Sequence, residues 1–204
     1  TSLSFIVGVV ALARRQALTK ELASVELLAR VDVLCLDKTG TITTGEISFA
    51  GLEPLGGSSE QDAASALGAM AAAEPSPNPT LVAIAATHGD PGWRVDDALP
   101  FSSARKWASA TFEGHGLHHL GAPDILLPDD EISARVTVHA GEGRRVLALT
   151  RSDAVGHSDP GSLPAERHPV ALVLLEDTVK PDVREILGYF IEQGLELKAI
   201  SGDH

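Results

Sequence analysis

The chain contains 204 residues, of which 44% are hydrophobic and 22% are charged. This balance is typical of a globular protein and excludes a chain that is disordered throughout. The 28 acidic and 16 basic residues give a net charge of −12, and so acidic a surface argues against nucleic acid as a partner. Because Cys35 is the only cysteine, an internal disulfide and a multi-cysteine zinc site are excluded, and a reducing compartment fits best.

The chain opens with an apolar run, LSFIVGVVALA at residues 3–13, which Arg14 and Arg15 close. The run is shorter than the roughly 20 residues that span a bilayer. An apolar segment followed by two arginines is typical of the cytoplasmic end of a transmembrane helix, although a buried core helix is the alternative. At the other end, residues 195–204 predict a strand and the loop after it. We therefore expect the chain to be part of a longer protein.

The segments between the ends predict two kinds of domain. Residues 16–30 have the spacing of an amphipathic helix, and the nearly continuous apolar run at 31–36 predicts a strand covered on both faces of a parallel sheet. Residues 50–168 are richer in Gly, Pro, Ala and Ser, and they predict helices at 61–74 and 81–87 and strands at 107–112, 135–139 and 144–150. The first pattern then resumes with a strand at 170–175, a helix at 182–193 and a strand at 197–200. We predict an α/β domain with a parallel sheet, interrupted by an inserted α+β domain with an antiparallel sheet.

The motif DKTGT, Asp37–Thr41, follows the strand at 31–36 directly. In parallel sheets the chemistry gathers outside the carboxyl ends of the strands, where Asp37 is placed. A carboxylate there can attack phosphorus and form an aspartyl-phosphate. Lys38, Thr39 and Gly40 offer a cation, a hydroxyl and an unhindered backbone to the phosphoryl group. A polar turn without chemistry is the alternative reading of these residue types.

DKTGT followed by Ile42 and Thr43 resembles the signature of the P-type ATPases, ion pumps of the haloacid dehalogenase superfamily. The resemblance extends over the whole chain. Phosphatases of that superfamily carry a second aspartate where this chain has Thr39, so a phosphatase is disfavoured. The resemblance implies a haloacid-dehalogenase-like phosphorylation domain with an inserted nucleotide-binding domain. Its expected parts are the cytoplasmic end of a transmembrane helix at 1–18, the stalk and first part of the phosphorylation domain at 19–49, the nucleotide-binding domain at 50–168, and the incomplete second part of the phosphorylation domain at 169–204.

Further segments resemble the nucleotide-binding stretches of the family. PFSSARKW, residues 100–107, places Phe101 to stack on adenine and Lys106 near the nucleotide, which suits a purine phosphate. A strand with a buried Phe and an extended Lys would look the same. LGAPD, residues 120–124, resembles the family's KGAPE with Leu120 in place of the lysine, so the backbone at Gly121 and Ala122 is the expected contact. In RRVLALT, Arg145 aligns with an arginine that meets the phosphates.

Two segments resemble the return to the phosphorylation domain. In EDTVKPDV, Asp177 and Lys180 take the positions of the family's acidic and basic hinge residues. Ser201, Gly202 and Asp203 match the start of the family's TGD motif. In the adenine region, Leu81 stands where such pumps often place a glutamate. His115, His118 and His119 lie in a Gly-rich segment without companion cysteines, and we interpret them as a solvated turn.

The resemblance implies ATP and Mg²⁺ as cofactors, with Asp37 as nucleophile, Lys38 and Thr39 beside it, and Mg²⁺ held by Asp37 and the backbone carbonyl of Thr39. The implied partners are ATP or ADP and the remainder of a pump, including membrane helices and an actuator domain. The parent protein would lie in the cell membrane with this segment, a monomer, on the cytoplasmic side. The segment alone is not expected to be catalytically competent. The histidine motif of the metal-pumping branch is missing, so Ca²⁺ or another non-heavy-metal cation is favoured. The alternative is a non-catalytic nucleotide-binding or regulatory module.

Overall fold

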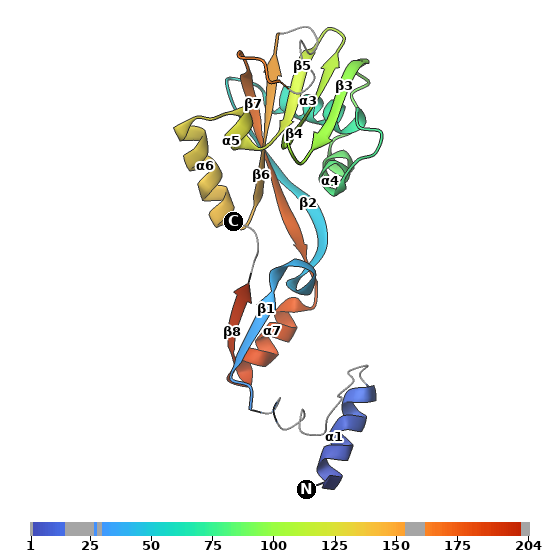
Figure 1. Cartoon of the computed structure of the whole chain (residues 1–204), viewed down its shortest axis with the longest axis vertical. Helices are drawn as coiled ribbons and strands as arrows, with labels where there is room; N and C mark the ends of the chain where they lie inside the picture. The colour runs from blue at the N-terminus through green and yellow to red at the C-terminus, as the bar shows by residue number, and fades with distance from the viewer. Residues whose placement is uncertain (1, 15–26, 28–29, 154–161, 201–204) are drawn as a thin grey trace. The chain divides into compact units, whose positions relative to one another are not determined.

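The computed structural model describes residues 2–14, 27, 30–153 and 162–200 (Figure 1). The chain divides into two compact units. One comprises Thr1–Thr44 and Val179–His204, and the other comprises Gly45–Thr178. The second unit is therefore inserted into the sequence of the first.

The first unit contains a parallel strand pair and two described helices. Strand β1, Val33–Asp37, pairs in parallel with β8, Glu196–Ile200, so that Asp37 lies opposite Ile200. Helix α7, Val183–Glu192, precedes β8, as a parallel crossover requires. Helix α1, Ser2–Arg14, covers the whole N-terminal apolar run. No helix within the described ranges has the length and apolar character needed to cross a membrane.

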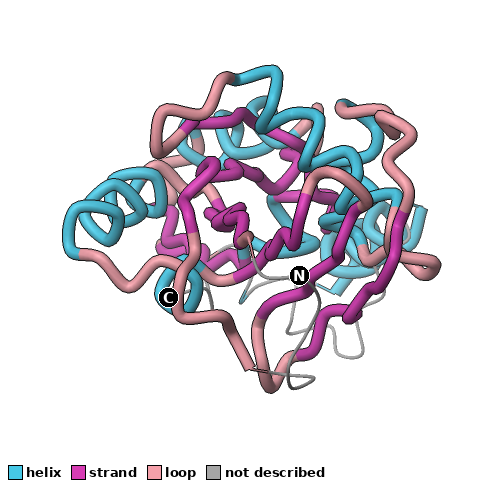
Figure 2. The backbone as a smooth tube through the Cα atoms, turned by 90° about the horizontal axis from the view of Figure 1, so that it is seen from above, coloured by secondary structure: helices cyan, strands magenta, loops and turns pink. Residues whose placement is uncertain are grey.

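The second unit is built on a six-stranded sheet in the order β2-β7-β6-β5-β4-β3. The neighbouring pairs from β3 to β7 are all antiparallel. The strands are β2, Thr43–Pro54; β3, Val95–Ser102; β4, Trp107–Phe112; β5, Gly116–Gly121; β6, Arg145–Ser152; and β7, His168–Val179. Figure 2 distinguishes these strands from the helices and loops around them. The expected fold class, a small parallel sheet and an antiparallel sheet with helices, is confirmed.

Helices of this unit begin at residues that cap them. Ser59 accepts a 3.1 Å hydrogen bond from the amide of Asp62 at the start of α3, Glu60–Ala72. Asn78 accepts one of 3.0 Å from the amide of Leu81 in α4, Pro79–Thr87. Each cap satisfies a backbone donor that has no partner within its helix. The other two helices are α5, Pro123–Leu126, and α6, Asp130–Gly141.

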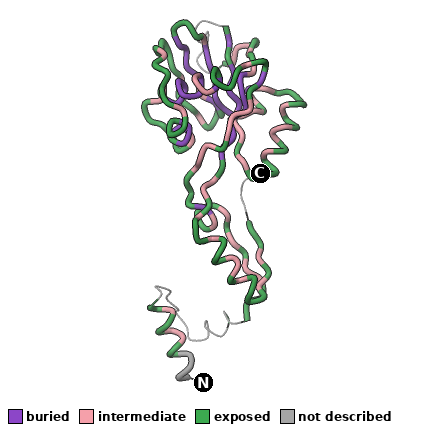
Figure 3. Tube along the Cα trace, turned by 180° about the vertical axis from the view of Figure 1, so that it is seen from behind, coloured by how far each residue is buried: buried purple, intermediate pink, exposed green. Residues whose placement is uncertain are grey.

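The two faces of the sheet carry two hydrophobic clusters, and Figure 3 shows the buried residues gathered in this unit. Leu67 of α3 and Ile84 of α4 belong to one cluster, and Leu126 of α5 belongs to the other. Successive side chains of β7 alternate between them: Ala171, Val173 and Leu175 lie in the first cluster, and Leu172 and Leu174 in the second. Burial on both faces explains the continuous apolar run of this strand.

Two expectations about this part of the chain are wrong. The strand expected at 170–175 exists, but it pairs antiparallel with β6 and does not resume a parallel sheet. The strand expected at 135–139 is instead part of helix α6. Asp129 caps that helix by accepting hydrogen bonds from the amides of Glu131 and Ile132, at 2.9 and 3.2 Å. Ile132 and Val136, one helical turn apart, pack on the second cluster, and this packing outweighs the alternating pattern of the sequence.

The remaining expected elements agree with the structure to within a few residues. These are the helices at 61–74, 81–87 and 182–193 and the strands at 31–36, 107–112, 144–150 and 197–200. Strands β2, β3 and β5 and the short helix α5 were not predicted. The helix expected at 16–30 lies almost wholly outside the described residues.

Candidate phosphorylation and nucleotide sites

Asp37 is the last residue of β1, and its side chain is exposed at the carboxyl end of this parallel strand. Its Oδ1 accepts a 3.3 Å hydrogen bond from the amide of Thr39. This bond orients the carboxylate at the start of the turn that follows, Lys38–Ile42. The geometry leaves an exposed carboxylate at the edge where parallel sheets place their chemistry.

The turn after Asp37 is held by its own polar groups. Gly40 adopts a φ of 78°, which a residue with a side chain rarely takes. The amide of Gly40 donates to Oγ1 of Thr43, and that hydroxyl donates to the carbonyl of Lys38, both at 3.3 Å. Thr43 is buried. Gly40 of the motif and Thr43, two residues after it, thus shape the turn that follows Asp37.

Lys180, which belongs to the second chain segment of the same unit, contacts this turn. Its Nζ donates a 2.8 Å hydrogen bond to the carbonyl of Gly40, and its amide donates a 3.1 Å bond to the carbonyl of Ile42. Lys180 lies directly after β7. The structure therefore brings the expected hinge lysine to the turn that contains the expected nucleophile.

Residues 101–106 form a second arrangement of expected site residues, in the inserted unit. Phe101 lies on β3, and 47% of its surface is exposed. Such exposure is unusual for a phenyl ring, which has no polar group to hydrogen-bond with water. Lys106 is exposed and has a φ of 61° in the turn between β3 and β4. Its amide donates a 2.6 Å hydrogen bond to the carbonyl of Ser102. The ring and the lysine are thus presented on one short, internally bonded turn.

Gly121 and Ala122 lie against this turn. The amide of Ala122 donates a 2.9 Å hydrogen bond to the carbonyl of Lys106. A Cβ on Gly121 would come within 2.5 Å of both the carbonyl oxygen of Lys106 and the Cβ of Trp107. Gly121 and Ala122 therefore support the Lys106 turn through these contacts, whether or not they also contact a ligand.

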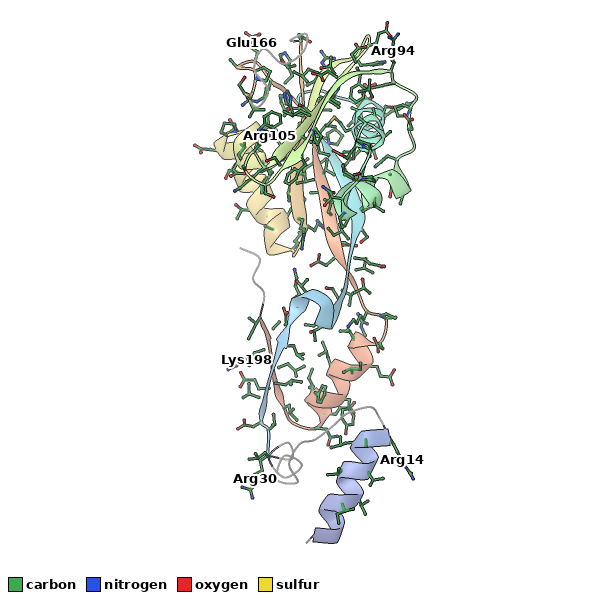
Figure 4. All side chains as sticks on the ribbon, turned by 45° about the vertical axis from the view of Figure 1, so that its right-hand side comes forward. Arg14, Arg30, Arg94, Arg105, Glu166 and Lys198 are labelled. Atoms are coloured by element: carbon green, nitrogen blue, oxygen red, sulfur yellow. The ribbon has the colours of Figure 1, made fainter. Side chains whose placement is uncertain are left out.

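Sequence reasoning missed one side chain of this turn. Nη2 of Arg105 donates a 2.6 Å hydrogen bond to the carbonyl of Pro100, and its guanidinium lies 5.4 Å from the centre of the Trp107 ring. Figure 4 labels Arg105. The sequence could have pointed to this arginine, because it directly precedes Lys106 in the segment at 100–107. Leu120 and Leu81, which replace charged residues of the family, are both buried in the first hydrophobic cluster.

Arg145 and Asp177 form an ion pair within the inserted unit. Nη2 of Arg145 lies 3.4 Å from Oδ1 of Asp177, and the side chain of Asp177 is 8% exposed. Arg145 begins β6, and Asp177 lies near the end of the neighbouring strand β7. Two residues that the sequence places in separate motifs are therefore partners. Ser201, Gly202 and Asp203 lie outside the described residues.

The interpretation of the three histidines as a solvated turn is wrong for two of them. His118 and His119 are buried in β5, because this strand lies between β4 and β6 in the sheet. His115 is exposed and stacks on Trp93, with ring centres 3.7 Å apart. Burial lowers the pKa of His118 to about 4; the backbone of Gly116 opposes this shift, and the charges of Arg151 and His115 add to it.

The residues at Asp37 suit Mg²⁺ in type and number. Within the described ranges no group of three His, Cys, Asp or Glu side chains could hold a metal ion. Mg²⁺ is commonly held by one or two carboxylates together with waters and substrate phosphates, and less often by an all-protein cage. An exposed carboxylate at Asp37 and a backbone carbonyl at Thr39 fit that mode.

Comparisons with known proteins extend these observations. The chain is 47% identical over 208 residues to the calcium-transporting ATPase CtpE of Mycobacterium bovis, and 38% identical over 206 residues to the probable cation-transporting ATPase exp7 of Streptococcus pneumoniae. Both alignments include the whole chain. The chain is homologous to P-type cation-transporting ATPases. It spans 26% of the length of each of these relatives.

The fold is also similar to that of a solved structure. A crystal structure of a zinc-transporting PIB-type ATPase in the E2.Pi state matches 97% of this chain with a TM-score of 0.68 at 22% identity. The match includes 30% of that longer chain. At this identity the similarity concerns the fold alone. No family model matches the chain.

Proposed function

We propose that this chain contains the phosphorylation site and the nucleotide-binding unit of an ATP-driven cation pump. One observation carries the proposal: Asp37 is exposed at the carboxyl end of a parallel strand, directly before a turn that Thr43 and Lys180 hold. That is the position of a nucleophile in an open α/β sheet. The ATP would bind in the inserted unit at Phe101 and Lys106, and its γ-phosphoryl group would pass to Asp37.

In the proposed step, a carboxylate oxygen of Asp37 forms a bond to the γ-phosphorus of ATP. The bond from that phosphorus to the oxygen bridging it to the β-phosphate breaks, and ADP leaves with the electron pair. Lys38 and Lys180 supply positive charge near a group whose negative charge spreads over three oxygens during transfer. Mg²⁺, when bound by Asp37 and the carbonyl of Thr39, neutralises phosphate charge. Thr39 stands where the phosphatases have their second acid, and its hydroxyl offers no carboxylate base to the aspartyl-phosphate.

The nucleotide part of the proposal rests on the turn at 101–106. An exposed aromatic ring beside an exposed lysine can hold a purine by stacking and a phosphate by charge. Arg145 lies on β6 of the same unit, and its ion pair with Asp177 fixes a guanidinium group that could contact phosphate. We infer that Gly121 and Ala122 contribute mainly by supporting the Lys106 turn.

Ca²⁺ is the cation we propose. This choice rests on the relative from Mycobacterium bovis, whose name gives calcium as the transported ion. ATPase activity of the full-length pump, measured with one ion at a time, tests it. Stimulation by Ca²⁺ alone is expected, and stimulation by a different cation in its place would contradict the choice.

The decisive experiment concerns Asp37. Asn at this position keeps the size and most hydrogen bonding of the side chain but removes the nucleophile. We expect the full-length pump with Asp37→Asn to form no acid-stable, hydroxylamine-sensitive phosphoenzyme from radiolabelled ATP, while Asp32→Asn, a control just before the same strand, labels normally. Normal labelling of Asp37→Asn would overturn the assignment.

A further inference from the structure

The inserted unit contains a cavity that the proposed function does not use. It has a volume of about 790 Å³ and lies where the loop at 56–58, the first turns of α3, the β4–β5 turn and the adjoining ends of β6 and β7 meet. In the register of β4 and β5, this is the end at Phe112 and Gly116, whereas Trp107 and Gly121, beside the Lys106 turn, form the opposite end. The cavity and the expected nucleotide site therefore occupy different ends of the sheet.

One wall of the cavity is aromatic. Trp93 and His115 stack with an interplanar angle of 8° and ring centres 3.7 Å apart. Trp93 also packs edge-on against Phe112, with ring centres 5.4 Å apart, which fixes its plane. Such a platform attracts planar apolar groups and cations over its face.

His118 supplies a buried polar atom in the same wall. The residue is 3% exposed and lines the cavity, and its Nδ1 has no hydrogen-bond partner among the described residues. Burial keeps its pKa near 4, so the ring is neutral at pH 7 and one of its nitrogens is an acceptor. The neutral ring therefore adds a polar group without formal charge to the wall of the cavity.

The charges of the lining favour a cationic ligand over an anion. Arg151, the only Lys or Arg in the described lining, lies 3.4 Å from Asp153, and His168 lies 3.7 Å from the same carboxylate. The carboxylate of Asp62 also lines the cavity; it accepts a 2.6 Å hydrogen bond from the hydroxyl of Ser59 and keeps further acceptor capacity. Because Asp153 is paired with Arg151, the carboxylate of Asp62 is the charge that the described lining can offer to a ligand.

Two backbone amides at the start of α3 are already hydrogen-bonded within the chain. The amide of Ser58 donates to the carbonyl of Leu55 at 2.9 Å, and the amide of Asp62 donates to the hydroxyl of Ser59 at 3.1 Å. Gly56 is pressed against β7, because a Cβ there would lie 2.6 Å from the carbonyl oxygen of Pro169. The loop is therefore a fixed wall of the cavity whose amides are partly engaged.

We propose that this cavity binds a small aromatic primary amine, with its ring on the Trp93–His115 platform and its ammonium group bonded to His118 and Asp62. The ring would use the stacking surface, and the ammonium would supply donors to a nitrogen and a carboxylate that can accept them. Such a ligand would bind at the end of the sheet away from the nucleotide turn.

Calorimetric titration of the chain with phenethylammonium tests the proposal, with 3-phenylpropionate as the anion of similar size. We expect saturable binding of the amine and no detectable binding of the anion. Asp62→Asn and His118→Leu should each weaken amine binding about tenfold or more, since each removes a hydrogen bond to a charged group. Asp130→Asn, the same change in the first turn of α6, should have no effect.

Several outcomes would overturn the proposal. These are no saturable binding of phenethylammonium, equal or tighter binding of 3-phenylpropionate, or unchanged amine binding in Asp62→Asn. Tighter binding of Nα-acetyl-lysine methylamide would assign the cavity to a lysine side chain of a protein segment and overturn the free amine. If His118→Leu does not fold, as judged by circular dichroism, Asp62→Asn decides the question. Unchanged ATP binding in Asp62→Asn separates this site from the nucleotide site.

Discussion

The ammonium of Lys180 donates a 2.8 Å hydrogen bond to the carbonyl of Gly40, a residue 140 positions earlier in the chain. This bond holds the turn after Asp37 from a distant part of the sequence. The hydroxyl of Thr43 holds the same turn locally, through the amide of Gly40 and the carbonyl of Lys38. Lys180 follows β7, where the chain leaves the inserted unit. Its bond therefore links this segment to the turn beside the expected nucleophile.

We predict that Lys180→Met loosens this turn. The variant loses a hydrogen bond that is worth about 0.5–1.5 kcal/mol, at the lower end here because the site is partly exposed. Hydrogen exchange at the amides of Gly40 and Thr43 should therefore become several-fold faster. Lys198→Met is the matched control, because Lys198 is an exposed lysine on β8 that pairs only loosely, at 3.5 Å, with Glu196. Equal protection in Lys180→Met and the parent chain would show that the bond does not hold the turn.

Phe101→Ala should weaken ATP binding about tenfold or more. Stacking of a base on an aromatic side chain contributes about 1–3 kcal/mol, and each 1.4 kcal/mol is roughly a factor of ten in affinity. Because Phe101 is half exposed, its loss should change the melting temperature little. Val95→Ala serves as control, since Val95 is a similarly exposed apolar residue of β3. Calorimetric titration with ATP measures both variants, and unchanged affinity in Phe101→Ala would remove Phe101 from the site.

Glu53 should make the stability of the inserted unit depend on pH. Burial raises its pKa, but hydrogen bonds from Arg135 and His139 together with their charges outweigh this, and the pKa falls below its ordinary value of 4.5. Stabilisation from a carboxylate with a lowered pKa is present above the unfolded-state pKa and is lost as pH falls through the folded-state pKa. Glu53→Gln should therefore lower the melting temperature at pH 7, and the difference from the parent chain should vanish in acid.

Glu113→Gln is the control for that experiment. Glu113 forms a 3.1 Å ion pair with Arg94, but both side chains are largely exposed. Exposed pairs contribute about 0–1 kcal/mol, so the melting temperature of this variant should follow the parent at every pH. A difference for Glu53→Gln that is constant from pH 7 into acid would contradict the role assigned to its ionised form.

The sequence predicted the position of Asp37 at the end of a parallel strand better than it predicted the sheet of the inserted unit. Asp37 could be placed because a parallel strand ends where its apolar run meets a polar motif, and this is a local property. The apolar run at 170–175 could not distinguish a parallel from an antiparallel partner, since both kinds of strand are apolar when covered on two faces. Its place beside β6 depends on contacts between distant residues.

Side-chain burial was the other limit of sequence reasoning. His118 looked solvated because it stands among glycines and other histidines, yet the strands on either side of β5 bury it. Likewise, the alternation at 135–139 indicated a strand until the cap at Asp129 and the packing of Val136 are taken into account. The partners of Arg145 and Lys180 also became visible only in the fold.

Arg105 should act on ATP binding through Phe101. Its hydrogen bond to the carbonyl of Pro100 and its position over Trp107 connect the two ends of the segment at 100–107. Arg105→Met keeps much of the side-chain volume but removes the bond, so Phe101 should be held less firmly and ATP affinity should fall several-fold. Arg94→Met, which changes an exposed arginine of the same unit (Figure 4), should leave affinity unchanged.

A double-mutant cycle shows whether Arg105 works by positioning Phe101 or contacts the nucleotide itself. If it positions the ring, Arg105→Met should have almost no further effect once Phe101 is alanine, because the group it holds is gone. If it contacts phosphate directly, the two losses should add, and the assigned role would be wrong. Calorimetric titration of ATP into the two single variants and the double variant measures the coupling. Arg105→Lys refines the result, since lysine cannot reproduce the planar group over Trp107 and should recover only part of the affinity.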